Sequence, residues 1–111
     1  MKAFEIFTRN NGRFYYRVIT ESGHNILSSD GYVEKKECQD VIEDVKEYFR
    51  RRKPVPIEQV TDDQWKFTLT NPENMIIGYS MIFHSRSQCE KWIRLMEEHL
   101  PLAETVELNP S

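Results

Sequence analysis

The sequence predicts an α+β fold in which two tandem β3-α-β repeats form one mainly antiparallel sheet, with both helices packed on one face. Two observations predict this fold. The chain aligns with itself at an offset of 51 positions, so that residues 13–49 fall on residues 64–100 without a gap. In each copy the apolar residues recur first with the period of a strand and then with the period of a helix. The 111 residues are therefore expected to form a single domain, with repeats at about 1–55 and 56–111.

The self-alignment depends on pattern more than on identity. Five of the 37 aligned positions carry the same residue, and the pairs include Cys38 with Cys89 and Ile42 with Ile93. Many other apolar positions also coincide. One unit alone would have too small a core to fold, whereas two units can join their strands into one sheet.

A hairpin is predicted at the start of each unit. Residues 4–8 and 14–18 alternate between apolar and polar side chains, which indicates two strands with one buried face each. The Asn-Asn-Gly segment at 10–12 lies between them, and Asn-Gly favours a tight turn because both residues tolerate a positive φ. In the second unit two aspartates at 62–63 stand at this turn, before a strand at 65–69.

A second turn and a third strand follow in each unit. Gly23 lies in this turn in the first unit, and Asn74 takes the corresponding position in the second. Asn is the usual substitute for Gly where the backbone must be left-handed. Third strands are predicted near 25–29 and 75–80.

The apolar period then changes to 3.6, which predicts one amphipathic helix in each unit. The buried stripes are expected at positions 38, 41, 42, 45 and 49 and, in the copy, at positions 89, 92, 93, 96 and 100. Ser85 and Gln88 have the spacing of a capping box, whereas Glu34 stands where the first helix would be capped. Pro54 and Pro101 close the two helices, because proline cannot continue a helix.

Extended segments are expected after both helices, at 55–57 and at 105–108. The residues from 55 to 61 must leave the first helix and also lead into the turn at 62–63. The pattern does not decide which strand of the sheet they pair with.

Several segments resemble the YegP-like tandem-repeat family of uncharacterised bacterial proteins. They are Gly31-Tyr32, Lys35-Lys36 with Cys38, Val41-Ile42 with Val45-Lys46 and, in the second unit, the run Ile-Ile-Gly-Tyr-Ser-Met at 76–81. The resemblance covers nearly the whole chain, because the repeat of the family matches both units in turn. It implies a β3-α-β unit used twice in one sheet, with the terminal strands exchanged between units, and it implies no established activity.

The composition excludes several classes of function. The net charge is −3, from 15 Lys and Arg against 18 Asp and Glu, which argues against binding nucleic acid or an anionic membrane with the whole surface. No apolar run is long enough to span a membrane, and two cysteines are too few for a disulfide scaffold. We therefore expect a cytoplasmic protein without membrane contact. We also expect a monomer, because the second copy takes the place that a twin chain would occupy.

No motif in the sequence predicts catalysis, a cofactor or a metal site. Cys38 and Cys89 lie on the buried helix stripes, where cysteine acts as a small apolar residue. His24, His84 and His99 have no metal-ligand spacing to one another or to the cysteines. We therefore expect a protein that is not an enzyme. A small-molecule enzyme that uses either cysteine as nucleophile is the last-ranked alternative, and it requires a lowered thiol pKa.

The candidate binding surface combines one sheet face with one basic segment. When the alternate residues of the strands face the helices, the others face away, and these include Tyr15, Arg17, Lys66 and Thr68. The basic segment consists of Arg50, Arg51, Arg52 and Lys53 after the first helix, where cations also complement the helix dipole.

Two functions are weighed for this surface against an ordinary solvated sheet face. The first is a binding or interaction module that contacts an unknown protein partner through the open sheet face. The alternative is single-stranded nucleic-acid binding through the same face and the Arg50–Lys53 cluster. Aromatic side chains can stack on bases, and basic side chains can contact phosphates.

Overall fold

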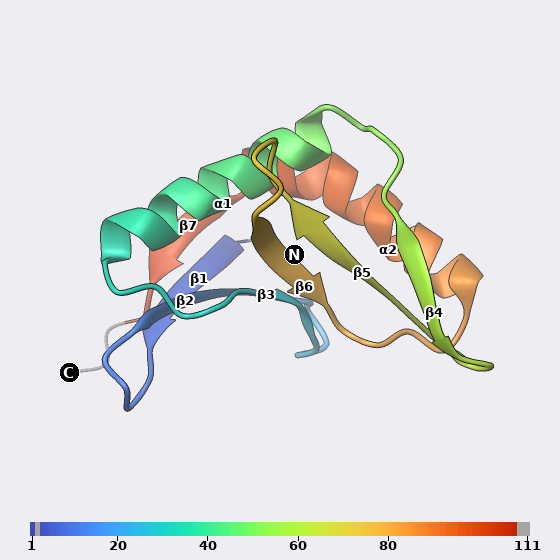
Figure 1. The fold of residues 1–111 in the computed structure, drawn as a ribbon, viewed down its shortest axis with the longest axis horizontal. Helices are drawn as coiled ribbons and strands as arrows, with labels where there is room; N and C mark the ends of the chain where they lie inside the picture. The colour runs from blue at the N-terminus through green and yellow to red at the C-terminus, as the bar shows by residue number, and fades with distance from the viewer. Residues whose placement is uncertain (2, 109–111) are drawn as a thin grey trace.

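The computed structural model describes residue 1 and residues 3–108. Strands and helices alternate along the chain in the order expected from the sequence periods (Figure 1). The elements are β1 (Ala3–Thr8), β2 (Phe14–Ile19), β3 (Asn25–Ser28), α1 (Lys35–Arg50), β4 (Ile57–Thr61), β5 (Gln64–Thr70), β6 (Ile76–Ser80), α2 (Arg86–His99), a 3-10 turn η1 (Leu100–Leu102) and β7 (Glu104–Glu107).

The described strands form a seven-stranded sheet in the order β4-β5-β6-β3-β2-β1-β7. Neighbouring strands are antiparallel except β1 and β7, which run parallel. The α+β class and the mainly antiparallel sheet are therefore as predicted. In Figure 1 α1 runs along the top of the view and α2 lies to its right.

Of residues 55–61, those from Ile57 to Thr61 form one edge of this sheet. Their strand, β4, begins at Ile57 and pairs antiparallel with β5 across the turn at 62–63. The opposite edge is β7, in which Val106 pairs with Glu5 of the first strand. The last strand of the chain therefore lies beside the first, a pairing across the whole sequence that no local pattern shows.

The core combines buried residues of the strands with buried residues of both helices. Tyr16, Val18, Phe67 and Leu69 are buried on the sheet side. The predicted helix stripes supply Cys38, Ile42, Val45 and Phe49 from α1 and Cys89, Ile93 and Met96 from α2, all of them buried. Burial of each large apolar side chain stabilises the fold by roughly 1.5–3 kcal/mol.

Two β-bulges modify the simple alternation of the third strands. The register shifts between Val18 and Ile19 and again between Leu69 and Thr70, at positions 51 residues apart. Each shift leaves one extra residue on the partner strand, which lets two consecutive residues face the core. The buried consecutive pairs are Ile26 with Leu27 and Ile77 with Gly78.

The first hairpin turn lies where the sequence predicts it, between strands that end at Thr8 and begin at Phe14. Within this turn Gly12 has a positive φ, of 76°, and Asn11 does not. The loop runs from residue 9 to residue 13, and the Gly12 N–H donates to the Arg9 carbonyl at 2.9 Å. The exchange of Gly23 for Asn74 is as predicted, since both residues are left-handed, with φ of 89° and 65°.

The helix starts differ from the predicted capping pattern. The Ser85 hydroxyl accepts from the Gln88 N–H at 3.0 Å, as expected, but the Gln88 side chain accepts from the N–H of His84, one residue before the cap. In the first helix the Glu37 carboxylate accepts from the Glu34 N–H at 3.2 Å, so this end is also capped.

Candidate interaction surface

One row of paired residues crosses the sheet on the side away from α1. The register joins Val106, Glu5, Arg17, Ser28, Tyr79 and Thr68 in this order, each on the strand next to the last. Paired residues share a face of the sheet. Because Tyr16 and Val18, the chain neighbours of Arg17, are buried on the side of β2 that contacts α1, this row lies on the opposite face. We call this face the open face.

The four predicted sheet residues all lie on the open face, in two separate groups. Tyr15 and Arg17 belong to β2, whereas Lys66 and Thr68 belong to β5. Strands β3 and β6 lie between them, so the two groups are about 14 Å apart at a strand spacing of about 4.8 Å. All four side chains are partly accessible. They share one surface but do not form one compact site.

Around Tyr15 and Arg17 the structure assembles a cation–aromatic cluster, which consists of Phe7, Arg9, Tyr15 and Arg17. The rings of Phe7 and Tyr15 stack with centroids 5.7 Å apart. The guanidinium of Arg17 lies 4.9 Å from the Phe7 centroid, and that of Arg9 lies 4.7 Å from the Tyr15 centroid. Such contacts hold both cations against aromatic faces.

Sequence reasoning missed Phe7 and Arg9 in this cluster. The signal was present in the alternation of the first strand, because Phe7 and Glu5 share a face and pair with Tyr15 and Arg17. It required the register of β1 on β2, which pairs Phe7 with Tyr15.

Neighbouring groups hold the cluster in place. The Asn11 amide donates to the Tyr15 hydroxyl at 2.7 Å, and Arg17 Nε donates to the Glu5 carboxylate at 2.9 Å. The Tyr15 ring lies so close to Gly31 that a Cβ at that residue would be 2.7 Å from ring atoms. Side chains that are ordered before binding lose less entropy when a partner arrives.

Farther along the same face, Tyr79 and Asp30 form a second polar contact. The Tyr79 hydroxyl donates to the Asp30 carboxylate at 3.1 Å. Partial burial, together with this carboxylate, raises the pKa of Tyr79. The phenol therefore stays a neutral hydrogen-bonding group at physiological pH.

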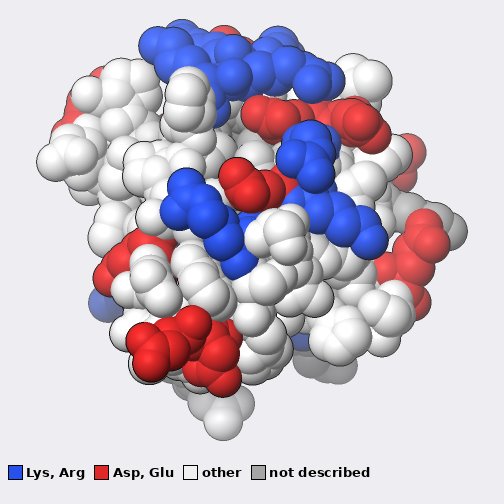
Figure 2. Space-filling model, turned by 90° about the vertical axis from the view of Figure 1, so that its right-hand side faces the viewer, with Lys and Arg blue, Asp and Glu red and all other residues white. Residues whose placement is uncertain are grey.

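The predicted basic segment does not extend the open face. It begins at the C-terminal end of α1, in the layer that packs on the other side of the sheet. Figure 2 shows Lys and Arg gathered along the top edge of that end of the molecule, with Asp and Glu directly beneath. A single ligand on the open face would therefore not contact this segment directly.

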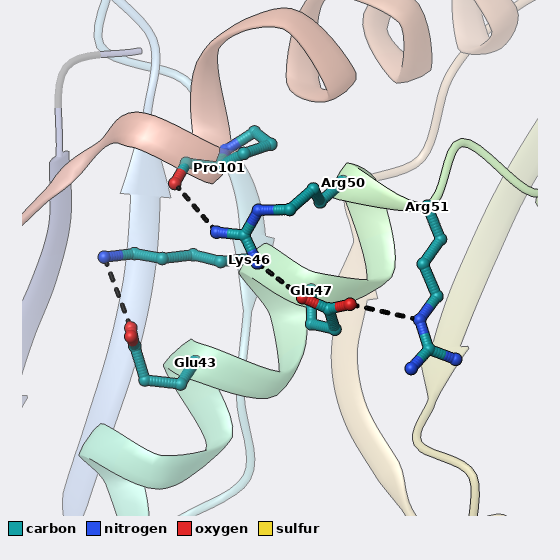
Figure 3. Close-up of polar contacts among 6 residues, drawn as sticks. All are labelled: Glu43, Lys46, Glu47, Arg50, Arg51 and Pro101. Carbon is teal, nitrogen blue, oxygen red and sulfur yellow. Dashed lines mark hydrogen bonds and ion pairs between the residues drawn. The ribbon is translucent and has the colours of Figure 1, made fainter.

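Carboxylates and carbonyls already engage part of this basic segment (Figure 3). Arg50 pairs with Glu47 and donates to the Pro101 carbonyl at 3.4 Å, while Arg51 pairs with the same carboxylate at 3.2 Å. These hydrogen bonds, that of Arg51 first, lower the pKa of Glu47. Arg52 is exposed and has a positive φ of 53°, which ends the helix.

The two cysteines are buried thiols without an activating group. Both have 0% of their surface exposed, and burial raises the pKa of each to about 11. They therefore stay protonated at neutral pH, which weakens the thiol-enzyme alternative.

Among residue 1 and residues 3–108, no group of three or more His, Cys, Asp and Glu side chains is placed to hold a metal ion. None of the helices in this part of the chain is both long and apolar enough to cross a membrane.

Known proteins match the chain in both sequence and fold. A family model described as a domain of unknown function (DUF1508) matches residues 10–50. A UPF0339 protein in the ptx operon 5' region of Stutzerimonas stutzeri is 29% identical over 105 residues, which is 95% of each chain. The solution structure of YegP from E. coli, a protein of unknown function, superposes with a TM-score of 0.85 at 18% identity, covering 100% of this chain and 97% of that one. The chain is thus similar in sequence to this UPF0339 protein and in fold to YegP.

A second solved structure agrees with this assignment. The UPF0339 protein of Shewanella oneidensis has a TM-score of 0.86 and 23% identity to this chain, over 96% of this chain and 90% of that one. The resemblance drawn from the residue pattern is thus confirmed. Since the family model and the E. coli protein are both described as of unknown function, the function of this chain must be argued from its own surface.

Proposed function

We propose that the chain is a protein-interaction module that binds a partner through the open face. The observation that carries this proposal is the pre-ordered cation–aromatic cluster on a face that the core does not use. Tyr and Arg are the residues that most often dominate the free energy of protein–protein binding. Here a Tyr and two Arg are held together by stacking and by the pair between Arg17 and Glu5.

We also infer that the domain consists of two copies of one unit, with both helices over the same face. Equivalent contacts at the 51-residue offset support this. The Tyr16 N–H donates to the Ser29 hydroxyl at 2.9 Å, and the Phe67 N–H donates to the Ser80 hydroxyl at the same distance. In this arrangement the helices bury one side of the sheet, and the other side remains for a partner.

The duplication supports a monomer as the working form. In a twofold dimer of single units, the second chain would occupy the place of residues 56–111. Light scattering should therefore give a mass near the 13.3 kDa of one chain. A mass twice as large would contradict this part of the proposal.

A protein partner is favoured over single-stranded nucleic acid. The rings of Phe7 and Tyr15 stack on each other, and each already has a guanidinium of this chain close to its centroid. A base could stack on them only by displacing these neighbours. The positive charge of Arg17 is also partly compensated by Glu5. The net charge of −3 adds repulsion toward phosphates.

The proposal is tested by comparing affinity purifications of matched variants from cell extract. Arg17→Ala removes a cation from the open face, and Arg94→Ala removes an exposed cation from α2. We expect one stoichiometric protein to be recovered by the wild type and by Arg94→Ala and to be lost with Arg17→Ala. Equal recovery by both variants would contradict the proposal. Salt-sensitive binding of an oligonucleotide that is lost with Arg17→Ala would favour the nucleic-acid alternative.

A further inference from the structure

A groove separate from the open face lies where the end of α1 meets the turn between β5 and β6. It has a volume of about 440 Å³, within the range of small-molecule sites. Its lining combines charged and polar side chains with three prolines. The lining residues are Asp44, Glu47, Tyr48, Arg51, Lys53, Pro54, Pro56, Thr70, Asn71 and Pro72.

Several polar side chains in this groove have no partner among residue 1 and residues 3–108. The Asp44 carboxylate, the Tyr48 hydroxyl and the Lys53 ammonium take part in none of the hydrogen bonds or ion pairs within this part of the chain. By contrast, Glu47 pairs with Arg51 and Arg50. The groove therefore offers an anion, a cation and neutral hydrogen-bonding groups to a ligand.

The fold does not itself require this set of side chains. At the 51-residue offset, Leu95 corresponds to Asp44 and His99 to Tyr48. The second helix thus forms with an apolar residue in place of the anion and an imidazole in place of the phenol. Packing of the helix accordingly does not explain why Asp44 and Tyr48 face this groove in the first half.

The prolines give this groove walls that are apolar and stiff. Pro54 and Pro56 lie in the segment between α1 and β4, and Pro72 lies in the β5–β6 turn. Proline fixes φ, so these walls lose little backbone freedom when a ligand binds. An apolar ligand body fits between such walls, with its polar ends at the charged side chains.

We propose that this groove binds a small zwitterion of amino-acid size. Asp44 takes the ammonium group of the ligand, Lys53 takes its carboxylate, and the Tyr48 hydroxyl hydrogen-bonds to one of the two ends. A ligand with one charge would leave the second charged side chain without a partner. The groove therefore selects for molecules that carry both charges at the separation of Asp44 and Lys53.

NMR titration of the 15N-labelled chain tests this inference. The probes are ω-amino acids with two to six carbons between the charged groups, and the controls are alkylamines and carboxylic acids of the same lengths. We expect at least one ω-amino acid to give saturable shifts at Asp44, Tyr48, Lys53 and Thr70, with the single-charge controls about tenfold weaker, the scale of a lost hydrogen bond to a charged group.

Matched variants separate a built site from general charge attraction. Asp44→Asn and Lys53→Ala should each weaken binding about tenfold. Asp40→Asn on the same helix and Lys91→Ala on α2, which do not line the groove, should leave the affinity unchanged.

Absence of saturable shifts with every ω-amino acid would overturn the inference. Equal binding of a single-charge control, or equal loss in Asp40→Asn, would overturn it as well. None of these outcomes bears on the open face, because no residue of the cation–aromatic cluster lines the groove.

Discussion

The hydroxyl of Tyr16 occupies the space in which a side chain at Gly78 would begin. A Cβ on Gly78 would lie 2.5 Å from this hydroxyl oxygen, which donates to the Ile77 carbonyl at 2.6 Å. At the 51-residue offset the sizes are reversed, since Phe67 has no hydroxyl and Leu27 has a full side chain. The two halves therefore fill the same kind of space with different pairs of residues.

This relationship predicts a strong coupling between the two positions. Gly78→Ala should destabilise the fold by roughly 1–3 kcal/mol, because the added methyl meets the hydroxyl in a packed core. Tyr16→Phe should cost about 1 kcal/mol through the lost hydrogen bond. The double variant should lose less than the sum of both, since Phe removes the atom that the methyl meets. Urea unfolding of the wild type, the two single variants and the double variant measures these free energies. Strictly additive losses of stability would contradict the predicted coupling.

Ser29 and Ser80 should contribute equally to stability. Each hydroxyl accepts from a backbone N–H of the neighbouring strand at 2.9 Å. Replacement of either serine by Ala should cost about 1 kcal/mol, the scale of one partly buried hydrogen bond. Ser87→Ala, an exposed position on α2, serves as the control in the same denaturation assay. A large loss at only one of the two serines would show that their roles differ.

Arg52 should be a site where glycine stabilises the protein. Its φ of 53° lies in the left-handed region, which costs a residue with a side chain roughly 1–2 kcal/mol. Arg52→Gly should raise the free energy of unfolding by about 0.5–1 kcal/mol, because the greater freedom of glycine in the unfolded chain offsets part of the gain. Asn74→Gly should change it less, since Asn tolerates this conformation. A loss of stability in Arg52→Gly would be inconsistent with this reading.

Both cysteines should react slowly in the folded protein. With a pKa of about 11, each thiol is ionised to only about one part in a thousand at pH 8. An aromatic disulfide reagent should therefore label Cys38 and Cys89 only on the timescale of unfolding, and rapidly in denaturant. Fast labelling of either cysteine under native conditions would revive the thiol-enzyme alternative.

The stabilising effect of Glu47 should disappear in acid. Hydrogen bonds from Arg51 and Arg50 lower the pKa of Glu47, so the folded state favours the ionised carboxylate. Its contribution is therefore present above about pH 4.3, the usual pKa of a free Glu, and is lost as the pH falls through the lower folded value. Wild type and Glu47→Gln should differ in stability at pH 7 and converge in strong acid. Glu97→Gln provides the control. A stability difference between the wild type and Glu47→Gln that grows in acid would contradict the expected pH dependence.

The elements with a strong local period could be predicted from the sequence. The helix stripes that contain Cys38 and Cys89 follow from apolar spacing alone, and both residues are buried as expected. The exchange of Gly23 for Asn74 also depends only on local backbone conformation. Such features are decided within one turn of helix or one hairpin, so a pattern of neighbouring residues contains them.

Features that depend on strand pairing could not be predicted in the same way. The parallel pairing of Val106 with Glu5 joins residues from opposite ends of the chain. The bulge that buries Ile26 depends on a register shift in its partner strand. Arg9 entered the candidate site only because the register brings Phe7 beside Tyr15. Each of these needs the three-dimensional neighbour, which residue periods do not contain.

The central claim, that the open face is the binding surface, is tested most directly by photo-crosslinking in cells. A benzophenone amino acid at Ser28 probes the middle of the open face, and the same residue at Glu90 probes the exposed side of α2. We predict one discrete protein adduct from position 28 that excess wild-type chain abolishes and excess Arg17→Ala chain does not. An adduct from position 90 alone, competition by Arg17→Ala equal to the wild type, or no adduct at either position would contradict the claim.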